Sequence, residues 1–231
     1  QTVQSISSSD MAARKEFAMV ILDRIDNDDN FSQRILFSDE ATFHVSGKAN
    51  KKNVQIWAPE NSHLTAEHVR DGSNVNVWCG IMHNRAFGPF FFKESFVTSQ
   101  IYLEMLNNFV YPQVEELQPD IIFQQDCAPS HWALIIRDSL DKTFPGRWIG
   151  RGGSIKWPPR SPDITPCDFF LWGYIKDRVY KTAVKDIVDL KARIEAAIGT
   201  ITQEMLQRTW QKFEHRLDLL RANNGAHIEV L

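Results

Sequence analysis

A proline-rich stretch, residues 157–166, limits what this chain can fold into more than any other part of the sequence. It holds four prolines in ten residues, and these keep residues 157–165 out of a helix, because each proline fixes φ, lacks an amide N–H and pushes the preceding residue toward extended geometry. The apolar residues up to about Tyr180 then predict a helix, with Thr165 as N-cap, Pro166 as first helical residue and Asp168 in the first turn. The sequence thus predicts a stiff loop that delivers a carboxylate at the start of an apolar helix.

The composition describes a chain large enough for one globular domain. Its 231 residues are 43% hydrophobic and carry a net charge of −3, so any DNA contact must come from local patches rather than from the overall field. Three widely spaced cysteines without a C-x-x-C pair indicate neither a disulfide framework nor a zinc site, and they favour a reducing compartment. No apolar run is long enough to span a membrane and no secretory signal is evident. We therefore expect a soluble intracellular protein.

Two more aspartates occur in apolar segments that precede the proline-rich stretch. Residues 35–45 alternate with period two, which predicts a strand, and Asp39 falls in the middle of its apolar face. An ionised carboxylate there is costly unless it is paired or bound to metal; the alternative is a strand interrupted at Ser38, with Asp39 in a turn. Residues 121–123 predict a central strand covered on both faces, and Asp126 lies just beyond its carboxyl end, where ligands collect in α/β sheets. For Asp126 alone, the alternative is a turn aspartate satisfied by backbone N–H groups.

The remaining elements follow from periodicity and capping signals. Helices are expected from Ser9 or Asp10 to Ile25, from Thr98 to Leu117 with a kink at Pro112, after Ser130 as N-cap, from Lys185 to Gly199, and from Thr202 as N-cap to Ala222. The helix after Ser130 is expected to bury one stripe formed by Trp132, Ile135, Ile136, Leu140 and Phe144. Strands are expected at Val75–Met82 and Pro89–Phe92, as an antiparallel pair, and near Ser154–Trp157.

Two long loops have a composition that suggests contact with a partner. Residues 46–73 are polar and irregular, and a loop of this length in a compact domain is usually functional or lies against another molecule. Residues 145–160 combine basic and aromatic side chains, which suit a phosphate backbone and unstacked bases; the alternative is a solvated loop. The residues concerned are Arg147, Arg151, Lys156 and Arg160, with Trp148 and Trp157.

Three segments together resemble the acidic motifs of the Tc1/mariner transposases. Residues 38–40 (Ser-Asp-Glu) are similar to the first motif, residues 125–131 (Gln-Asp-Cys-Ala-Pro-Ser-His) to the second, and residues 159–169 (Pro-Arg-Ser-Pro-Asp-Ile-Thr-Pro-Cys-Asp-Phe) to the third. The second and third matches are long and specific, and the resemblance covers roughly residues 10–231. It implies an α/β, RNase H-like fold in which helices flank a mixed central sheet.

The resemblance also implies a division of the chain and a set of partners. Residues 1–34 would be an N-terminal segment with a linker helix, and residues 35–231 the DDE/D catalytic domain. The partners would be DNA, both transposon ends and target, and a second copy of the chain, since residues 46–73 match in position the family's loop that clasps the partner subunit. The resemblance implies a nuclear location. It implies no membrane association and no small-molecule substrate.

The chemistry implied by the resemblance is metal-dependent DNA cleavage and strand transfer. By motif position, Asp39, Asp126 and Asp168 would be catalytic and would hold two Mg²⁺ or Mn²⁺ ions, hard cations that prefer oxygen ligands. Such ions activate a water or a 3′-hydroxyl and stabilise the leaving oxygen. Glu40 and Asp163 lie beside these ligands; Asp163 is nearer the common spacing, but Asp168 matches the ligand position within the motif.

Two departures from the family pattern leave alternatives open. Between Asp126 and Asp168 stand 41 residues, more than family members commonly have, and the excess falls around residues 145–153. The family's N-terminal helix-turn-helix region, which reads the transposon ends, is absent from this chain, so we expect a fragment, a truncated copy or a domesticated remnant. The alternatives are a nonspecific RNase H-like nuclease and a remnant that binds DNA or dimerises without turnover.

Overall fold

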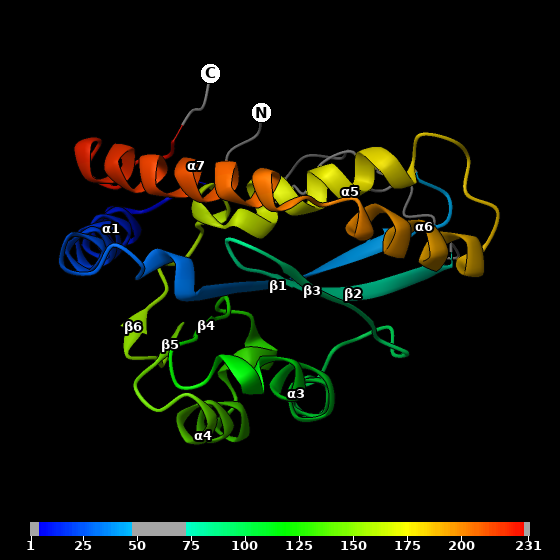
Figure 1. Cartoon of the computed structure of the whole chain (residues 1–231), viewed down its shortest axis with the longest axis horizontal. Helices are drawn as coiled ribbons and strands as arrows, with labels where there is room; N and C mark the ends of the chain where they lie inside the picture. The colour runs from blue at the N-terminus through cyan, green and yellow to red at the C-terminus, as the bar shows by residue number, and fades with distance from the viewer. Residues whose placement is uncertain (1–4, 48–72, 229–231) are drawn as a thin grey trace, which may run out of the picture.

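A mixed β-sheet forms the centre of the molecule in the computed structural model, which describes residues 5–47 and 73–228 (Figure 1). In that part of the chain the sheet has six strands in the order β3-β2-β1-β4-β5-β6. Their bounds are β1 Ile35–His44, β2 Asn74–Ile81, β3 Ala86–Phe91, β4 Ile122–Gln124, β5 Trp148–Gly150 and β6 Ile155–Lys156. The first three strands pair antiparallel, whereas β1, β4, β5 and β6 run parallel. The predicted mixed sheet and antiparallel pair are confirmed.

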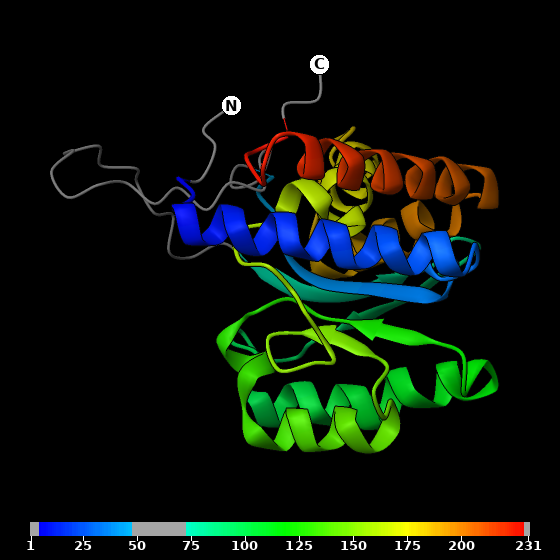
Figure 2. The same ribbon diagram turned by 90° about the vertical axis from the view of Figure 1, so that its left-hand side faces the viewer.

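Helices cover both faces of this sheet, as Figures 1 and 2 show. Their bounds are α1 Ser8–Asn27, α2 Ser99–Met105, α3 Tyr111–Val114, α4 Leu134–Thr143, α5 Trp172–Val179, α6 Ile187–Gly199 and α7 Gln203–Ala222. Helices α1, α5, α6 and α7 lie on one face, and α3 and α4 lie on the other. None of these helices is both long and apolar enough to cross a membrane.

Strand β1 divides the hydrophobic core into two clusters, because successive side chains point to opposite faces of a sheet. Phe37 belongs to the cluster under α5 and α7, where its ring meets those of Trp157, Trp210 and Phe213 edge to face at 4.9–6.2 Å. Leu36 belongs to the cluster on the α2–α4 side. The strand continues through Ser38, so the interrupted strand considered from the sequence is wrong.

The C-terminal loop closes onto α1 through a glycine and a buried arginine. Gly225 has φ +84, and a Cβ at this position would lie 1.9 Å from the carbonyl oxygen of Met11, so no larger residue fits. Its carbonyl accepts a hydrogen bond of 2.8 Å from Nε of Arg14, which is fully buried. Helix α1 begins with a capping box between Ser7 and Asp10, and Phe17 packs into the core beneath it.

The second half of the chain departs from the sequence predictions at two helix starts. Ser130 does not cap a helix; it lies in a 3₁₀ turn, and α4 begins later, at Leu134, with Ile135 43% exposed rather than buried. The hydroxyl of Thr165 donates to the carbonyl of Ser161 instead of capping the helix. The backbone carbonyl of Thr165 nevertheless accepts the first helical bond, from the amide of Asp168 at 2.9 Å.

Two other segments are more irregular or more ordered than predicted. The helix expected from Thr98 to Leu117 is split into α2, a π-helical turn at Leu106–Val110 and α3. Pro112 lies two residues after the widened turn.

The loop 145–160 contains β5, which the sequence analysis missed. Trp148 and Trp157 in this loop are buried in the core, so neither can stack on nucleic-acid bases. Residues 48–72, most of the loop predicted to clasp a second subunit, lie outside the described residues.

Candidate active site

The pairing of β1 with β4 brings two of the three predicted acids to the same level. Phe37 stands opposite Gln124 in this parallel pair, and the hydroxyl of Ser38 donates to the carbonyl of Gln124 at 2.7 Å. Asp39 and Asp126 each follow two residues later. Because parallel strands run in the same direction, the two carboxylates arrive together at the carboxyl end of β4.

Asp39 is enclosed by protein and by negative charge. The indole Nε1 of Trp172 donates to its Oδ2 at 2.7 Å. Burial raises the pKa of Asp39 well above its ordinary range, and the charges of Asp168, Asp126 and Glu40 raise that pKa further. Asp39 therefore lies within electrostatic reach of three other carboxyl groups at this point of the sheet.

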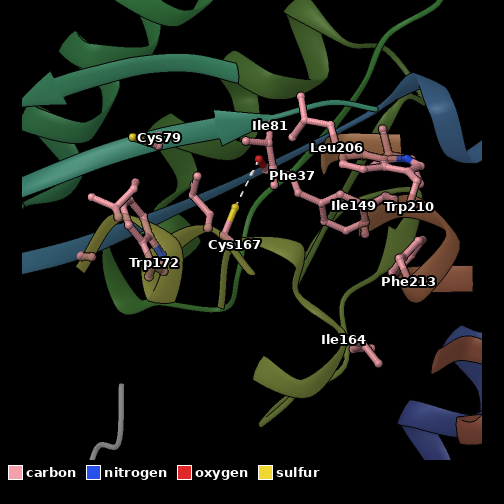
Figure 3. Packing of buried hydrophobic residues seen from close by; sticks show 14 of the residues in the cluster. Phe37, Cys79, Ile81, Ile149, Ile164, Cys167, Trp172, Leu206, Trp210 and Phe213 are labelled. Atoms are coloured by element: carbon pink, nitrogen blue, oxygen red, sulfur yellow. Dashed lines mark hydrogen bonds between the residues drawn. The ribbon is translucent and has the colours of Figure 1, made fainter. Parts of the chain in front are cut away.

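Asp168 reaches the site on a helix start that is fastened to β1. Residues 167–171 form a π-helical turn, a feature frequent at functional sites, that leads directly into α5. The thiol of Cys167 donates to the carbonyl of Phe37 at 3.6 Å, and Trp172 lies beside it against the sheet (Figure 3). Lys176, one turn further along α5, is buried nearby; burial lowers the pKa of its ammonium group, whereas the charges of Asp168 and Asp39 raise it.

Asp163, the rival candidate for the third acid, is engaged elsewhere. Its two carboxylate oxygens accept hydrogen bonds from Arg14 at 2.8 and 2.5 Å, and its Oδ2 also accepts from the amide of Ile228 at 3.1 Å. Burial alone would raise the pKa of Asp163, but the bonds and charge of Arg14 outweigh burial and hold the pKa below its ordinary value. The geometry thus favours Asp168 over Asp163 as a companion of Asp39.

Asp126 is held by a charged histidine. Its Oδ1 lies 2.6 Å from Nδ1 of His131 and accepts from the amide of Ala128 at 2.9 Å. His131 is buried, stacks on Tyr102 and places Nε2 3.3 Å from Oε2 of Glu40. Burial alone would lower the pKa of His131, but the two carboxylates raise it to about 10. The alternative of a turn aspartate satisfied by backbone N–H groups therefore accounts for the contact with Ala128 but not for the ion pair with His131.

Two residues that shape this site had no role in the sequence analysis. His131 and Trp172 each contact one of the predicted acids directly; His131 is the last residue of the second motif, and Trp172 lies three residues beyond the third. Trp172 follows Asp168 by four residues, a spacing that places both on one face of a helix. Because His131 is remote from the other histidines, a search for metal-binding histidine pairs passes over it, whereas a search for a partner of Asp126 would find it.

The donor chemistry of the site suits a divalent cation. Carboxylate oxygens dominate it, and Oε1 of Glu40 is buried without a hydrogen-bond partner among the described residues. Hard cations such as Mg²⁺ and Mn²⁺ take such oxygen ligands. As the side chains stand, no group of three or more His, Cys, Asp or Glu residues in residues 5–47 and 73–228 is placed to hold a metal ion. A cation would have to draw the carboxylates closer together.

Comparison with known proteins finds relatives of one kind. The mariner Mos1 transposase of Drosophila mauritiana is 22% identical over 97% of this chain and 64% of its own length. The Tc3 transposase of Caenorhabditis elegans is 24% identical over 80% of this chain and 54% of its own length. The chain thus spans less than two thirds of either relative, and no family model matches it.

Solved structures of Mos1 share the fold. The Mos1 catalytic domain with raltegravir and Mn has a TM-score of 0.76 at 18% identity and covers 98% of this chain and 100% of its own. The corresponding structure with Mg has the same TM-score. A Mos1 paired-end complex with the left transposon end has a TM-score of 0.79 at 22% identity, covering 99% of this chain and 66% of that one. The fold of this chain is therefore RNase H-like, as in the Mos1 catalytic domain.

Proposed function

We propose that this chain, a homologue of the mariner Mos1 and Tc3 transposases, cleaves and joins DNA by metal-dependent chemistry at Asp39, Asp126 and Asp168. The observation that carries the proposal is the convergence of three acids from a strand, a strand end and a helix start. Each lies in a separate part of the sequence, and the charges of Asp126 and Asp168 both act on Asp39. Structural need alone does not explain such a concentration of carboxylates, since it destabilises the fold unless a cation offsets it.

Two Mg²⁺ or Mn²⁺ ions, when bound, would activate the attacking oxygen and stabilise the leaving oxygen of a phosphodiester. The protein's own contribution is to fix the orientation of the ligands. The oxygen Oδ2 of Asp39 accepts a hydrogen bond from Trp172, and the oxygen Oδ1 of Asp126 is ion-paired with His131, so the other oxygen of each carboxylate would face a cation. Such supporting bonds typically change metal affinity by about 10–100-fold.

The same proposal assigns roles to the parts of the chain. Residues 35–231 would form the catalytic domain, and residues 1–34 would link it to a preceding region, with α1 already docked on the core. Transposon-end and target DNA would be the substrates and a second copy of the chain the partner. The location would be nuclear, where that DNA is found. The paired-end complex of Mos1 supports the assignment of DNA as substrate.

The test is an assay of cutting and joining in Mn²⁺, with a labelled duplex that carries a nick or a free end. We expect cleaved and joined products from the wild type and neither from Asp126→Asn or Asp168→Asn. Asp163→Asn is the matched control in the third motif and should retain both activities at a temperature where circular dichroism shows it folded. Equal activity of wild type and Asp126→Asn would refute the proposal.

Two further readouts separate the alternatives. Cleavage without joining would identify a nonspecific nuclease of the same fold. Titration calorimetry that shows no Mn²⁺ binding to the wild type would identify a remnant without turnover. Loss of Mn²⁺ binding in Asp163→Asn but not in Asp168→Asn would show that the third ligand is assigned to the wrong residue.

A further inference from the structure

Two arginines lie on one tryptophan between Asp126 and Asp168, and one of them, Arg151, belongs to the segment that lengthens this interval. The guanidinium carbon of Arg137, on α4, lies 4.4 Å from the ring centroid of Trp132. That of Arg151, in the loop after β5, lies 4.3 Å from the same ring. We call these three residues the Arg–Trp–Arg cluster. Guanidinium groups stacked on an indole keep their N–H donors in the plane of the stack, free to bind oxygen anions.

The fold places this cluster at the edge of the sheet that carries Asp126. Strands β4 and β5 are parallel, so the segments that follow them leave from the same edge. The loop after β5 packs tightly there: a Cβ on Gly152 would lie 2.9 Å from Cδ of Arg137 and 3.3 Å from the ring of Trp132. Trp132 in turn directly follows His131, which is bonded to Asp126.

Within the described residues, the positive charge of the cluster has no acidic partner. Neither Arg137 nor Arg151 forms an ion pair there, and the buried Nε of Arg137 has no hydrogen-bond partner. Other arginines of the same region are used by the protein itself. Arg147 donates to Gln118 and to the carbonyl of Ile121, and Arg160 pairs with Asp10.

The segment that carries Arg151 also packs against the acidic segment. A Cβ on Gly150, the residue before Arg151, would lie 3.3 Å from Cγ of Gln125, the residue before Asp126. A negatively charged DNA strand that approaches four carboxylates needs a local source of positive charge, because the chain as a whole is acidic.

We propose that Arg137 and Arg151, supported by Trp132, bind backbone phosphates of the DNA strand that enters the site at Asp126. The proposal rests on the proposed function for its substrate, but it concerns binding and not turnover. Two guanidinium groups already lie over the indole, so Trp132 orients the arginines and does not stack on a base. The contacts are to phosphate and carry no sequence preference.

The test measures binding of a fluorescent duplex by anisotropy at several salt concentrations, without divalent metal. Each phosphate contact makes the slope of log K against log salt steeper by about 0.9. The double variant Arg137→Gln/Arg151→Gln should bind roughly 100-fold more weakly at low salt, since two charge-assisted bonds are lost, and its slope should be shallower by about 1.8. Arg151→Lys, which keeps the charge without the planar stack, should keep the slope but bind less tightly than the wild type.

Arg24→Gln is the matched control. Arg24 is exposed, as Arg151 is, and lies over an aromatic ring, 5.7 Å from the centroid of Phe31, but next to the amino end of β1. It should leave affinity and slope unchanged. The proposal is overturned if the double variant matches Arg24→Gln, or if the wild type binds no DNA. If the wild type cleaves DNA but the double variant binds DNA with the same affinity and slope as the wild type, this proposal alone is overturned. If DNA binding depends on the two arginines but the wild type does not cleave DNA, this proposal is supported and the proposed function is not.

Discussion

Replacing Asp163 by asparagine should lower the stability of the protein while leaving its metal affinity intact. The side chain of Asp163 is 14% exposed and pairs at 2.5 Å with that of Arg14, which is 0% exposed. Removing one partner of a buried pair typically costs about 3–5 kcal/mol, because the other charge stays buried. Arg14 keeps Ser161 and the carbonyls of Gly225 and Arg160 as acceptors, so the lower end, about 3 kcal/mol, is expected.

The effect should depend on pH in a defined direction. The pKa of Asp163 is held below its ordinary value in the folded protein, so the unfolded chain binds this proton more readily. The stabilisation is therefore fully present above the ordinary aspartate pKa of about 3.9 and is lost as pH falls through the lower, folded pKa. Wild type and Asp163→Asn should differ most near neutral pH and converge in acid.

Urea denaturation at pH 7 and at pH 3 measures both predictions. At pH 7 a loss of about 3 kcal/mol corresponds to a fall in Tm of roughly 6–12 °C for a chain of this size. Asp28→Asn is the control, since Asp28 pairs with Arg34 at the same distance of 2.5 Å but both are partly exposed; it should change stability far less. Equal effects of the two substitutions at pH 7 would refute the argument from burial.

Three further substitutions test the supporting contacts. Trp172→Phe removes the N–H that donates to Asp39 and should weaken Mn²⁺ binding about 10-fold, as measured by calorimetry. An unchanged affinity would show that Trp172 does not orient Asp39 for the metal. His131→Gln removes the charge that holds Asp126 and should reduce cleavage at least about 10-fold in a chain that circular dichroism shows folded; undiminished cleavage would contradict it. Gly225→Ala forces a Cβ to within 1.9 Å of a backbone oxygen and should destabilise the protein by about 1–3 kcal/mol in urea, an expectation that an unchanged midpoint would exclude.

The sequence was most informative where one local rule dominated. The alternation in residues 35–45 predicted β1 and the face on which Asp39 lies, because period-two patterning follows directly from strand geometry. Thr202 caps α7 as predicted, since its hydroxyl accepts from the amide of Met205. The predicted caps at Ser130 and Thr165 were wrong, because the helix after Ser130 begins later and the hydroxyl of Thr165 donates to a carbonyl four residues earlier. A capping signal in the sequence shows only that a side chain is able to cap a helix, and not that it does so in the fold.

The sequence proposed the three acids of the candidate site but none of the residues that contact them. Motif position already favoured Asp168 over Asp163, and the structure adds a reason that the sequence does not contain, the ion pair of Asp163 with Arg14, which is 149 residues away. The interpretation of loop 145–160 as a nucleic-acid surface was wrong for its tryptophans, which fill the core. The aromatic residue that holds Arg151 is Trp132, which the periodicity of its own segment assigned to a buried stripe.

Asp163 and Asp168 are attached to different elements of the fold, and this separates the effects predicted for the two acids. Arg14, on α1, binds Asp163. Beyond the proline-rich stretch, Cys167 donates to the carbonyl of Phe37 and Trp172 donates to Asp39, so the turn that carries Asp168 is tied directly to β1. Loss of the first attachment removes stability but leaves the second in place. Metal affinity should therefore follow the attachment to β1, and folding stability the attachment to α1.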